Sequence, residues 1–325
     1  MSLDVAINLT SLKLVKEELE NTLAHASTEF EAFLANDEDF NHAEHALKAM
    51  QQLAGTFKLV EFPGAALLAQ EMAETLRALI AGDIKASDAV LGAITHNLFV
   101  LPRYIEYIGI RQAALPSLLI PYINELRMVR KESLLPEYHF VGFDVTVSPT
   151  LEPGEPQLSL LLSSVGRLRH MYQVGFLGLI SEKRPSPYFA QLILRALSRV
   201  DAMLVGHEGR ELWYLAKGLA SCWAAAPLEV TLNRKRLLAA IEGQFRQLVS
   251  LGEQALSQDH SQLKKDLLYL IATTDTDDGC VQAIKQAYAL PAIGMSNSEL
   301  TQQREHMYGP SIDTMESVVK VIKEE

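Results

Sequence analysis

The chain has 325 residues, of which 48 % are hydrophobic and 21 % charged, so it can bury a substantial core and is expected to form two domains. Its formal net charge of -11 disfavours nonspecific binding to nucleic acid and to anionic membranes, because the summed field repels polyanions. It has no apolar run of about 18 residues and no apolar core near its start, so neither membrane insertion nor a signal peptide is expected.

Apolar residues recur at helical spacing through residues 1–133, in five segments with short turn-rich connections. Five such helices predict an up-and-down bundle. Pro102 falls inside the fourth segment and is expected to kink or restart it. The segments are expected from Thr10 or Ser11 to Asn36, from Asn41 as a cap to Phe62, from Pro63 to Gly82, from Ser87 to Ile110 and from Pro116 to Glu132.

Residues 134–156 carry four prolines and two glycines and are expected to connect two domains, with a short strand at Phe143 to Val147. Residues 157–290 again contain five amphipathic segments and predict a second helical bundle. Residues 291–325 are expected to form a C-terminal arm, mobile or extended up to residue 310, with a short helix after it. The predicted fold class is therefore all-α, with two helical bundles in tandem.

The second predicted helix has the most informative surface. Gly55 lies in mid-helix among polar residues, where it costs roughly 1 kcal/mol of helix stability relative to Ala, and close approach of another protein is one reason to keep it. Helical spacing predicts a stripe facing water or a partner beside a buried face. The stripe is Lys48, Gln51, Gly55 and Lys58, and the buried face is Leu47, Met50, Leu53, Ala54 and Phe57.

Residues 51–59, QQLAGTFKL, resemble the active helix of a histidine phosphotransfer (HPt) domain. That pattern is His, any residue, an aliphatic residue, Lys or Arg, Gly, three variable residues and a hydrophobic one. Gln51 stands at the His position and Ala54 at the basic position, and an amide cannot replace the nucleophilic imidazole. The resemblance therefore implies a degenerate HPt domain of four antiparallel helices. Its docking surface would comprise Lys48, Gln51, Gln52, Gly55 and Lys58.

A second register makes His45 the phosphorylated residue. Leu47 and Lys48 then match the aliphatic and basic positions, but Ala49 takes the place of the glycine. The downstream residues GTFKLVE fit only the first register. An active phosphotransfer protein using His45 is therefore kept as the alternative.

Three further stretches, FVLPRYIEYI, GRLRHMYQVGFLGLI and KKDLLYLIA, extend the resemblance over most of residues 1–290. They are similar to the FimL family of type IV pilus regulators, which carry Gln at the phosphotransfer position, and to the N-terminal region of the pilus hybrid chemotaxis-type kinase ChpA. The resemblance implies a cytoplasmic, non-enzymatic scaffold, acting at the cell pole, that links chemosensory signalling to twitching motility and cyclic AMP control. The implied partners are a CheY-like response regulator and a polar pilus hub protein. A homo-oligomer and a purely structural helical module are left open.

Other chemical signals in the sequence are weak, and no enzyme active site, metal or cofactor is predicted. His42 and His45, with Asp39 and Glu44 nearby, resemble half a metal site, but no third and fourth ligand follow at the required spacing. Exposed helical histidines are therefore favoured. Cys222 and Cys280 lack paired-motif spacing and are expected to be small buried hydrophobes in a reduced chain.

Two loop or helix patterns in the second half are also weak. Residues 214–218, YLAKG, faintly echo the HPt pattern with Tyr214 at the His position, so an HPt-like second bundle is left open and phosphotransfer there is not expected. Residues 275–279 resemble part of a calcium loop but lack its final bidentate Glu, which favours a solvated connection.

Overall fold

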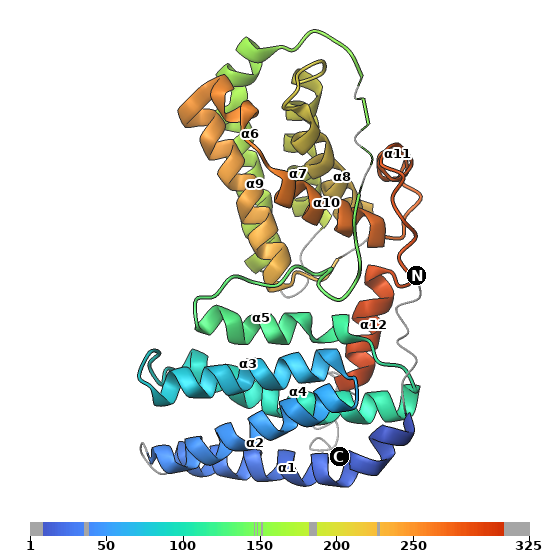
Figure 1. Ribbon diagram of the computed structural model, residues 1–325. Helices are drawn as coiled ribbons and strands as arrows, with labels where there is room; N and C mark the ends of the chain where they lie inside the picture. Colours follow the sequence, from blue (N-terminus) through green and yellow to red (C-terminus); the bar gives the residue numbers. More distant parts are fainter. Residues whose placement is uncertain are drawn as a thin grey trace, which may run out of the picture. The chain divides into compact units, whose positions relative to one another are not determined.

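The computed structural model describes residues 9–35, 39–145, 147, 149–150, 152–181, 187–225 and 228–308 (Figure 1). Within these residues the secondary structure is helical and contains no strand, so the predicted all-α fold class is confirmed. The chain divides into two compact units. Unit 1 contains residues 1–141 with 300–325, and unit 2 contains residues 142–299.

The predicted strand at Phe143 to Val147 is wrong for the residues described there, which are irregular. Phe143 is buried and packs edge-on against Tyr269, with ring centroids 5.3 Å apart. The segment is thus held by a side-chain contact and not by a ladder with a neighbouring strand. The boundary between the units falls inside the predicted connection 134–156, while the predicted bundle limits 1–133 and 157–290 stay predictions.

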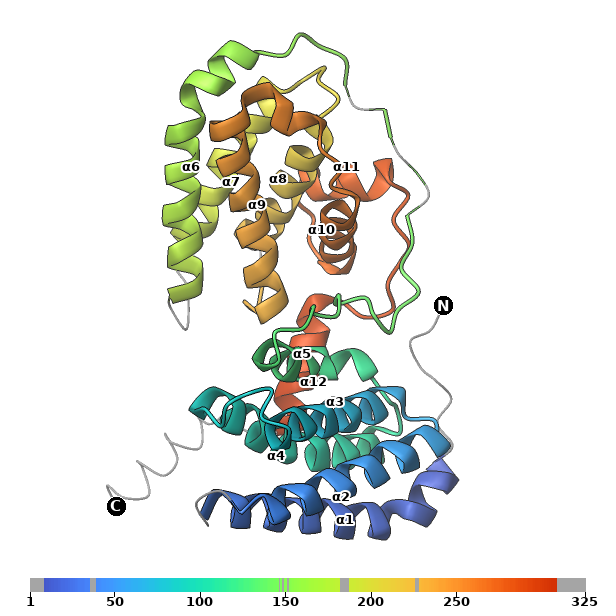
Figure 2. The same ribbon diagram turned by 60° about the vertical axis from the view of Figure 1, so that its left-hand side comes forward.

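Unit 1 is built from helices that pack against their neighbours along the chain, with α1 and α2 side by side (Figures 1 and 2). Ser87 caps α4 as predicted, and Pro102 lies within this helix without ending it. Asp39, and not the predicted Asn41, caps α2, because its carboxylate accepts the backbone N–H of Asn41 at 3.1 Å. The elements are α1 (Leu9–Ala35), α2 (Phe40–Leu59), α3 (Pro63–Ile80), α4 (Asp88–Arg111), the 3₁₀ helix η1 (Pro116–Leu119) and α5 (Ile120–Val129).

Two features join the later helices of unit 1 to α3. A Cβ added at Gly64 would lie 2.8 Å from the Cβ of Pro116, so glycine lets the start of α3 approach η1 closely. Buried Glu71 forms ion pairs with Arg127, at 2.5 Å, and with Arg130. These charged hydrogen bonds connect α3 to the end of α5.

Between residues 142 and 287, the described part of unit 2 packs six α-helices around a second core. The Tyr172 hydroxyl donates to the Leu238 carbonyl at 2.8 Å, and the rings of Trp213 and Phe245 meet edge-on at 4.8 Å. These contacts join α6 and α8 to α9. The elements are α6 (Leu158–Ser181), α7 (Pro187–Met203), α8 (Arg210–Ala225), α9 (Leu232–Leu251), the 3₁₀ helix η2 (Gly252–Ser257), α10 (Ser261–Thr273) and α11 (Gly279–Ala287).

The last described helix, α12 (Asn297–Tyr308), was not expected, because residues 292–310 were predicted to be mobile or extended. Leu300, Arg304 and Met307 are buried at helical spacing. Only two of these three side chains are apolar, which is too few for a periodic hydrophobic signal in the sequence. The short helix predicted after residue 310 lies outside the described residues. Among the helices of the described chain, none is both long and apolar enough to span a membrane.

Candidate docking face on helix α2

Helix α2 has a buried face made largely of small residues and an opposite polar face. Four of the five residues predicted to be buried are buried, while Leu47 is partly exposed. Small side chains let α1 and α3 pack close to α2, which leaves its remaining side for solvent. The buried residues are Ala43, Ala46, Ala49, Met50, Leu53, Ala54 and Phe57.

The five residues predicted as a docking surface are all exposed, and α2 brings them together along one side of the helix. Lys48 and Gln51 are one turn apart, as are Gln51 and Gly55, and Lys58 follows Gly55 by three residues. Gln52 lies at the edge of this group. Within the described residues no hydrogen bond fixes the Gln51 side chain, so its amide is available to a partner.

Gly55 is not required by the packing of its own chain. A Cβ at this position would meet no atom within 4 Å, so the glycine weakens the helix without relieving a contact. Gly92 and Gly109 in α4 are equally open, so an exposed glycine does not by itself mark a site. Gly55 is informative because it adjoins Gln51, at the position where the HPt pattern also has glycine.

Leu59 extends this surface and was not included in the predicted docking residues. Its side chain is 86 % exposed at the end of α2, although the HPt pattern has a hydrophobic residue there. Leu59 follows Gly55 by one helical turn, and this i, i+4 spacing was the signal that could have identified it. We call Lys48, Gln51, Gln52, Gly55, Lys58 and Leu59 the α2 face. It extends about 17 Å along the helix.

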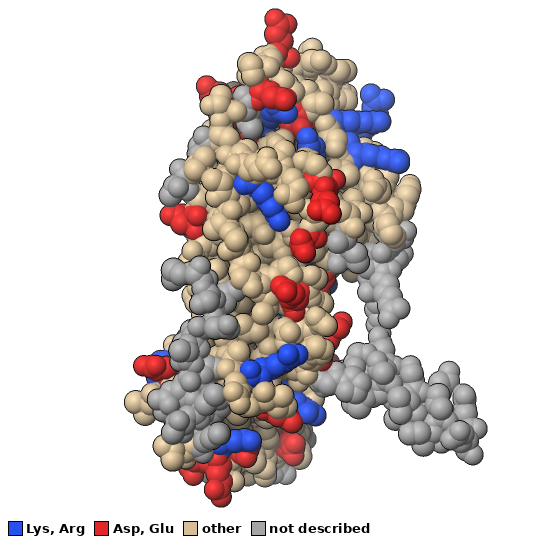
Figure 3. Space-filling view, turned by 90° about the vertical axis from the view of Figure 1, so that its right-hand side faces the viewer, with Lys and Arg blue, Asp and Glu red and all other residues tan. Residues whose placement is uncertain are grey.

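The α2 face is locally basic in an acidic chain. No Asp or Glu occurs between His45 and Val60, whereas Lys48 and Lys58 flank the open glycine. Lys58 is positioned by α3, since its ammonium donates to the side-chain oxygen of Gln70 at 3.1 Å. Figure 3 shows acidic and basic side chains interspersed on one side of the molecule, without a broad patch of one sign.

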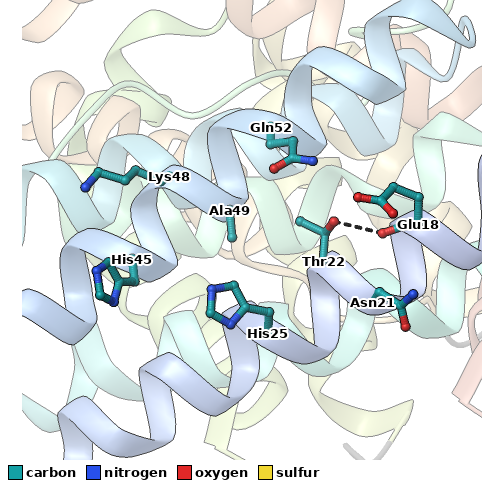
Figure 4. Close-up of a pocket in the computed structure, with 8 residues that line it drawn as sticks. All are labelled: Glu18, Asn21, Thr22, His25, His45, Lys48, Ala49 and Gln52. Atoms are coloured by element: carbon teal, nitrogen blue, oxygen red, sulfur yellow. Dashed lines mark hydrogen bonds between the residues drawn. The ribbon is translucent and has the colours of Figure 1, made fainter.

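A pocket of about 350 Å³ lies between α1 and α2, beside the α2 face (Figure 4). Lys48 and Gln52 border both surfaces. The hydroxyl of Thr22 donates to the carbonyl of Glu18 at 2.8 Å, so this hydroxyl is satisfied within α1. The lining residues are Glu18, Asn21, Thr22, His25, His45, Lys48, Ala49 and Gln52.

His45, the phosphorylated residue of the alternative register, is exposed. Its Nδ1 lies 3.2 Å from a carboxylate oxygen of Glu29 on α1, which leaves Nε2 directed elsewhere. Ala49, at the glycine position of that register, is buried. The alternative register thus offers an imidazole but no open small residue beside it.

The YLAKG stretch in α8 has a different environment. The Lys217 ammonium lies 2.6 Å from the buried carboxylate of Asp201, and a Cβ at Gly218 would overlap the side chain of Ile284. Tyr214, at the His position of this weak echo, is only partly exposed. This stretch is used for internal packing of unit 2.

The cysteines and the predicted calcium-like loop have structural roles. Burial raises the pKa of the Cys222 thiol to about 11, so it remains protonated and unreactive at neutral pH. Cys280 is half-buried, and burial also raises its pKa. The Asp278 carboxylate accepts the backbone N–H groups of Cys280 and Val281 and thereby caps α11.

The described fold and the α2 face place the chain among all-α proteins built from helical units that present an exposed helix surface. Its residues 159–301 match the family model described as the FimL scaffold protein second domain. The chain is also 31 % identical over 322 residues to the scaffold protein FimL of Pseudomonas aeruginosa. Together these matches show that the chain is similar to the FimL scaffold protein over almost its whole length.

The match to the Pseudomonas aeruginosa protein covers 97 % of this chain but 56 % of that relative, so the chain spans about half the length of the curated relative. No solved structure matches the chain. The likeness of unit 1 to an HPt domain, and of the chain to the hybrid kinase, therefore stays a prediction.

Proposed function

We propose that this chain is a non-catalytic scaffold that docks a signalling protein through the α2 face. The observation that carries the proposal is the exposed Gln51 beside the open Gly55, in a helix position where a phosphotransfer protein has His and Gly. The name of the FimL relative, a scaffold protein, supports a binding role. An amide at position 51 preserves a recognisable shape and removes the nucleophile.

The proposed partner is a CheY-like response regulator with an acidic rim around its contact surface. Lys48 and Lys58 would lie over this rim, because opposite charges at an interface guide association and orientation. Gly55 would let the partner approach the middle of the face closely, and exposed Leu59 would supply an apolar contact at its end. A polar pilus hub protein is a second proposed partner, and control of twitching motility and cyclic AMP is the proposed outcome of the assembly.

Binding of purified receiver domains from pilus response regulators to the immobilised chain tests this proposal. Gly55→Arg should reduce binding at least about tenfold, because a long side chain would hold the partner away from the helix. Gln51→Glu should weaken binding less, by placing a negative charge between the two lysines. Gly92→Arg is the matched control, since Gly92 is equally exposed and open on α4. Equal binding by the Gly55→Arg and Gly92→Arg variants would show that the partner does not dock through the α2 face.

The alternative is phosphotransfer through His45, and one observation favours it. The Glu29 carboxylate beside Nδ1 would orient the ring with Nε2 as the nucleophile. Incubation with a phosphorylated response regulator separates the two functions. Acid-labile label on this chain that is lost in His45→Ala would establish phosphotransfer. The scaffold proposal expects no label on the unmodified chain or on the His45→Ala variant.

A further inference from the structure

Three of the chain's nine histidines gather around one carboxylate, that of Glu29 on α1. His42 Nδ1 lies 2.8 Å and His45 Nδ1 3.2 Å from Glu29 Oε2. His25, one turn before Glu29, has its Nδ1 3.8 Å from Oε1. Figure 4 shows His25 projecting from α1 and His45 from α2 at the same end of the pocket.

The spacing of these atoms suits a small cation. One ligand atom from each of Glu29, His42 and His45 lies within 4.8 Å of the others. Ligands at about 2.0 to 2.1 Å from a tetrahedral zinc ion are about 3.3 Å apart. The distance from Glu29 Oε2 to His45 Nδ1, 3.2 Å, is close to this value, and the 2.8 Å to His42 Nδ1 would have to lengthen. His25 lies outside this group of three, with its Nδ1 3.8 Å from the other oxygen of Glu29, so it would reach the ion only after a change of side-chain rotamer.

The donor set also selects the class of metal. Imidazole nitrogens with a single carboxylate suit zinc and its divalent neighbours, whereas calcium and magnesium prefer a cage of oxygens. Glu29 supplies the carboxylate oxygen, and His42 and His45 supply the imidazole nitrogens, so the site combines both kinds of donor. Metal binding requires each imidazole to offer the lone pair of one ring nitrogen to the ion.

We propose that Glu29, His42 and His45, with His25 as the fourth ligand, bind one zinc ion or a similar divalent transition-metal ion. The ion would replace the imidazole–carboxylate hydrogen bonds as the link between α1 and α2. It would therefore fix the beginning of α2, one turn before Lys48 and the α2 face. The site does not depend on the docking proposal, because its ligands lie outside that face.

The sequence contains the two halves of this site without joining them. His25 and Glu29 are an i, i+4 pair, and His42 and His45 are an i, i+3 pair. Since α1 ends at Ala35 and α2 begins at Phe40, Glu29 and His45 lie almost equally far from the turn and face each other across the helix pair. The missing third and fourth ligands therefore precede the two histidines in the chain.

Calorimetric titration of the chelator-treated full chain with Zn²⁺ tests this site. We expect one ion per chain, with affinity reduced by about tenfold or more in each of His42→Ala, His45→Ala and Glu29→Gln, and less in His25→Ala. His96→Ala is the matched control, because His96 also pairs with a glutamate, Glu125 at 2.8 Å, but does not belong to the group of possible metal ligands found among the described residues. Its affinity for zinc should equal that of the unmodified chain.

A second readout keeps the test decisive. Co²⁺ should give the visible absorption of a tetrahedral site in the unmodified chain and in His96→Ala, and lose it in His42→Ala. The melting temperature should rise with Zn²⁺ only where the ligands are intact, because binding to the folded state alone stabilises it. Absence of binding, or binding unchanged in a His42→Ala/His45→Ala double variant with a native circular dichroism spectrum, would overturn the proposal.

Discussion

Helices α2 and α8 both carry a glycine at a position suggested by the phosphotransfer pattern, but the structure uses the two glycines differently. Gly55 is open to solvent beside an unconstrained Gln51, whereas Gly218 is covered by Ile284 and the neighbouring Lys217 is paired with Asp201. The same kind of short pattern thus marks a surface in unit 1 and a packing contact in unit 2. The burial of the residues around each glycine, and not the sequence pattern, therefore distinguishes a possible binding surface from an internal packing contact.

The largest expected effect on stability concerns the ion pairs that Asp201 forms with Arg210 and Lys217 of α8. Asp201 is buried and accepts from Arg210 Nε at 2.7 Å and from Lys217 at 2.6 Å. Asp201→Ala removes the carboxylate from Lys217 and leaves Arg210 only the 3.8 Å contact with exposed Glu152. The change should lower the free energy of unfolding by about 3 to 5 kcal/mol. Denaturant unfolding measures this loss, with exposed Asp83→Ala as control. A loss as small as that of the control would mean that α8 is not anchored internally.

The two glycines should respond oppositely to a larger side chain. Gly218→Leu should destabilise the protein by about 1 to 3 kcal/mol, because the added atoms overlap Ile284 in a packed core. Gly55→Leu should cause no such loss, since nothing lies near its Cβ. Chemical unfolding curves of the two variants give both values. Similar losses of stability at the two sites would contradict the claim that Gly218 is packed and Gly55 is open.

A smaller effect should accompany removal of the open glycine. Gly55→Ala should raise the free energy of unfolding by about 0.4 to 1 kcal/mol, because alanine restricts the unfolded chain and favours the helix. The same change should leave docking nearly intact, since a methyl group is short. Thermal unfolding measures the gain, and a loss of stability would indicate a contact at Gly55 that the structure lacks.

The smallest expected effect is a pH dependence at the α4–α5 contact. The hydrogen bond to Glu125 raises the pKa of His96 in the folded state, although burial opposes this shift. The stabilisation is therefore complete below the unfolded pKa of about 6.5 and is lost as pH rises through the higher folded value. Unfolding at about pH 5.5 and about pH 8.5 should show this loss, and His96→Gln should abolish it. An unchanged pH dependence in His96→Gln would assign it to other groups.

Much of unit 1 was predictable because local signals and packing agree there. Pro63 begins α3 and Ser87 caps α4, and the exposed stripe of α2 follows from helical periodicity. Leu59 was missed because a hydrophobic residue in a pattern is expected inside. Its exposure depends on where α2 ends.

Features that depend on contacts between distant segments could not be read from local patterns. Glu29 becomes a neighbour of His42 and His45 only when α1 folds against α2. Helix α12 has too few apolar residues to stand out, and Phe143 packs on a ring far along the chain. The fold class was therefore easier to predict than the site.

The most direct test of the docking account is photo-crosslinking in the cell from a benzophenone amino acid placed at position 51 or, as the counterpart in α8, at position 214. The account predicts a crosslink to a response regulator from position 51 and none from position 214. A partner that copurifies with both variants but is captured only from position 214, or from neither, would contradict docking through α2.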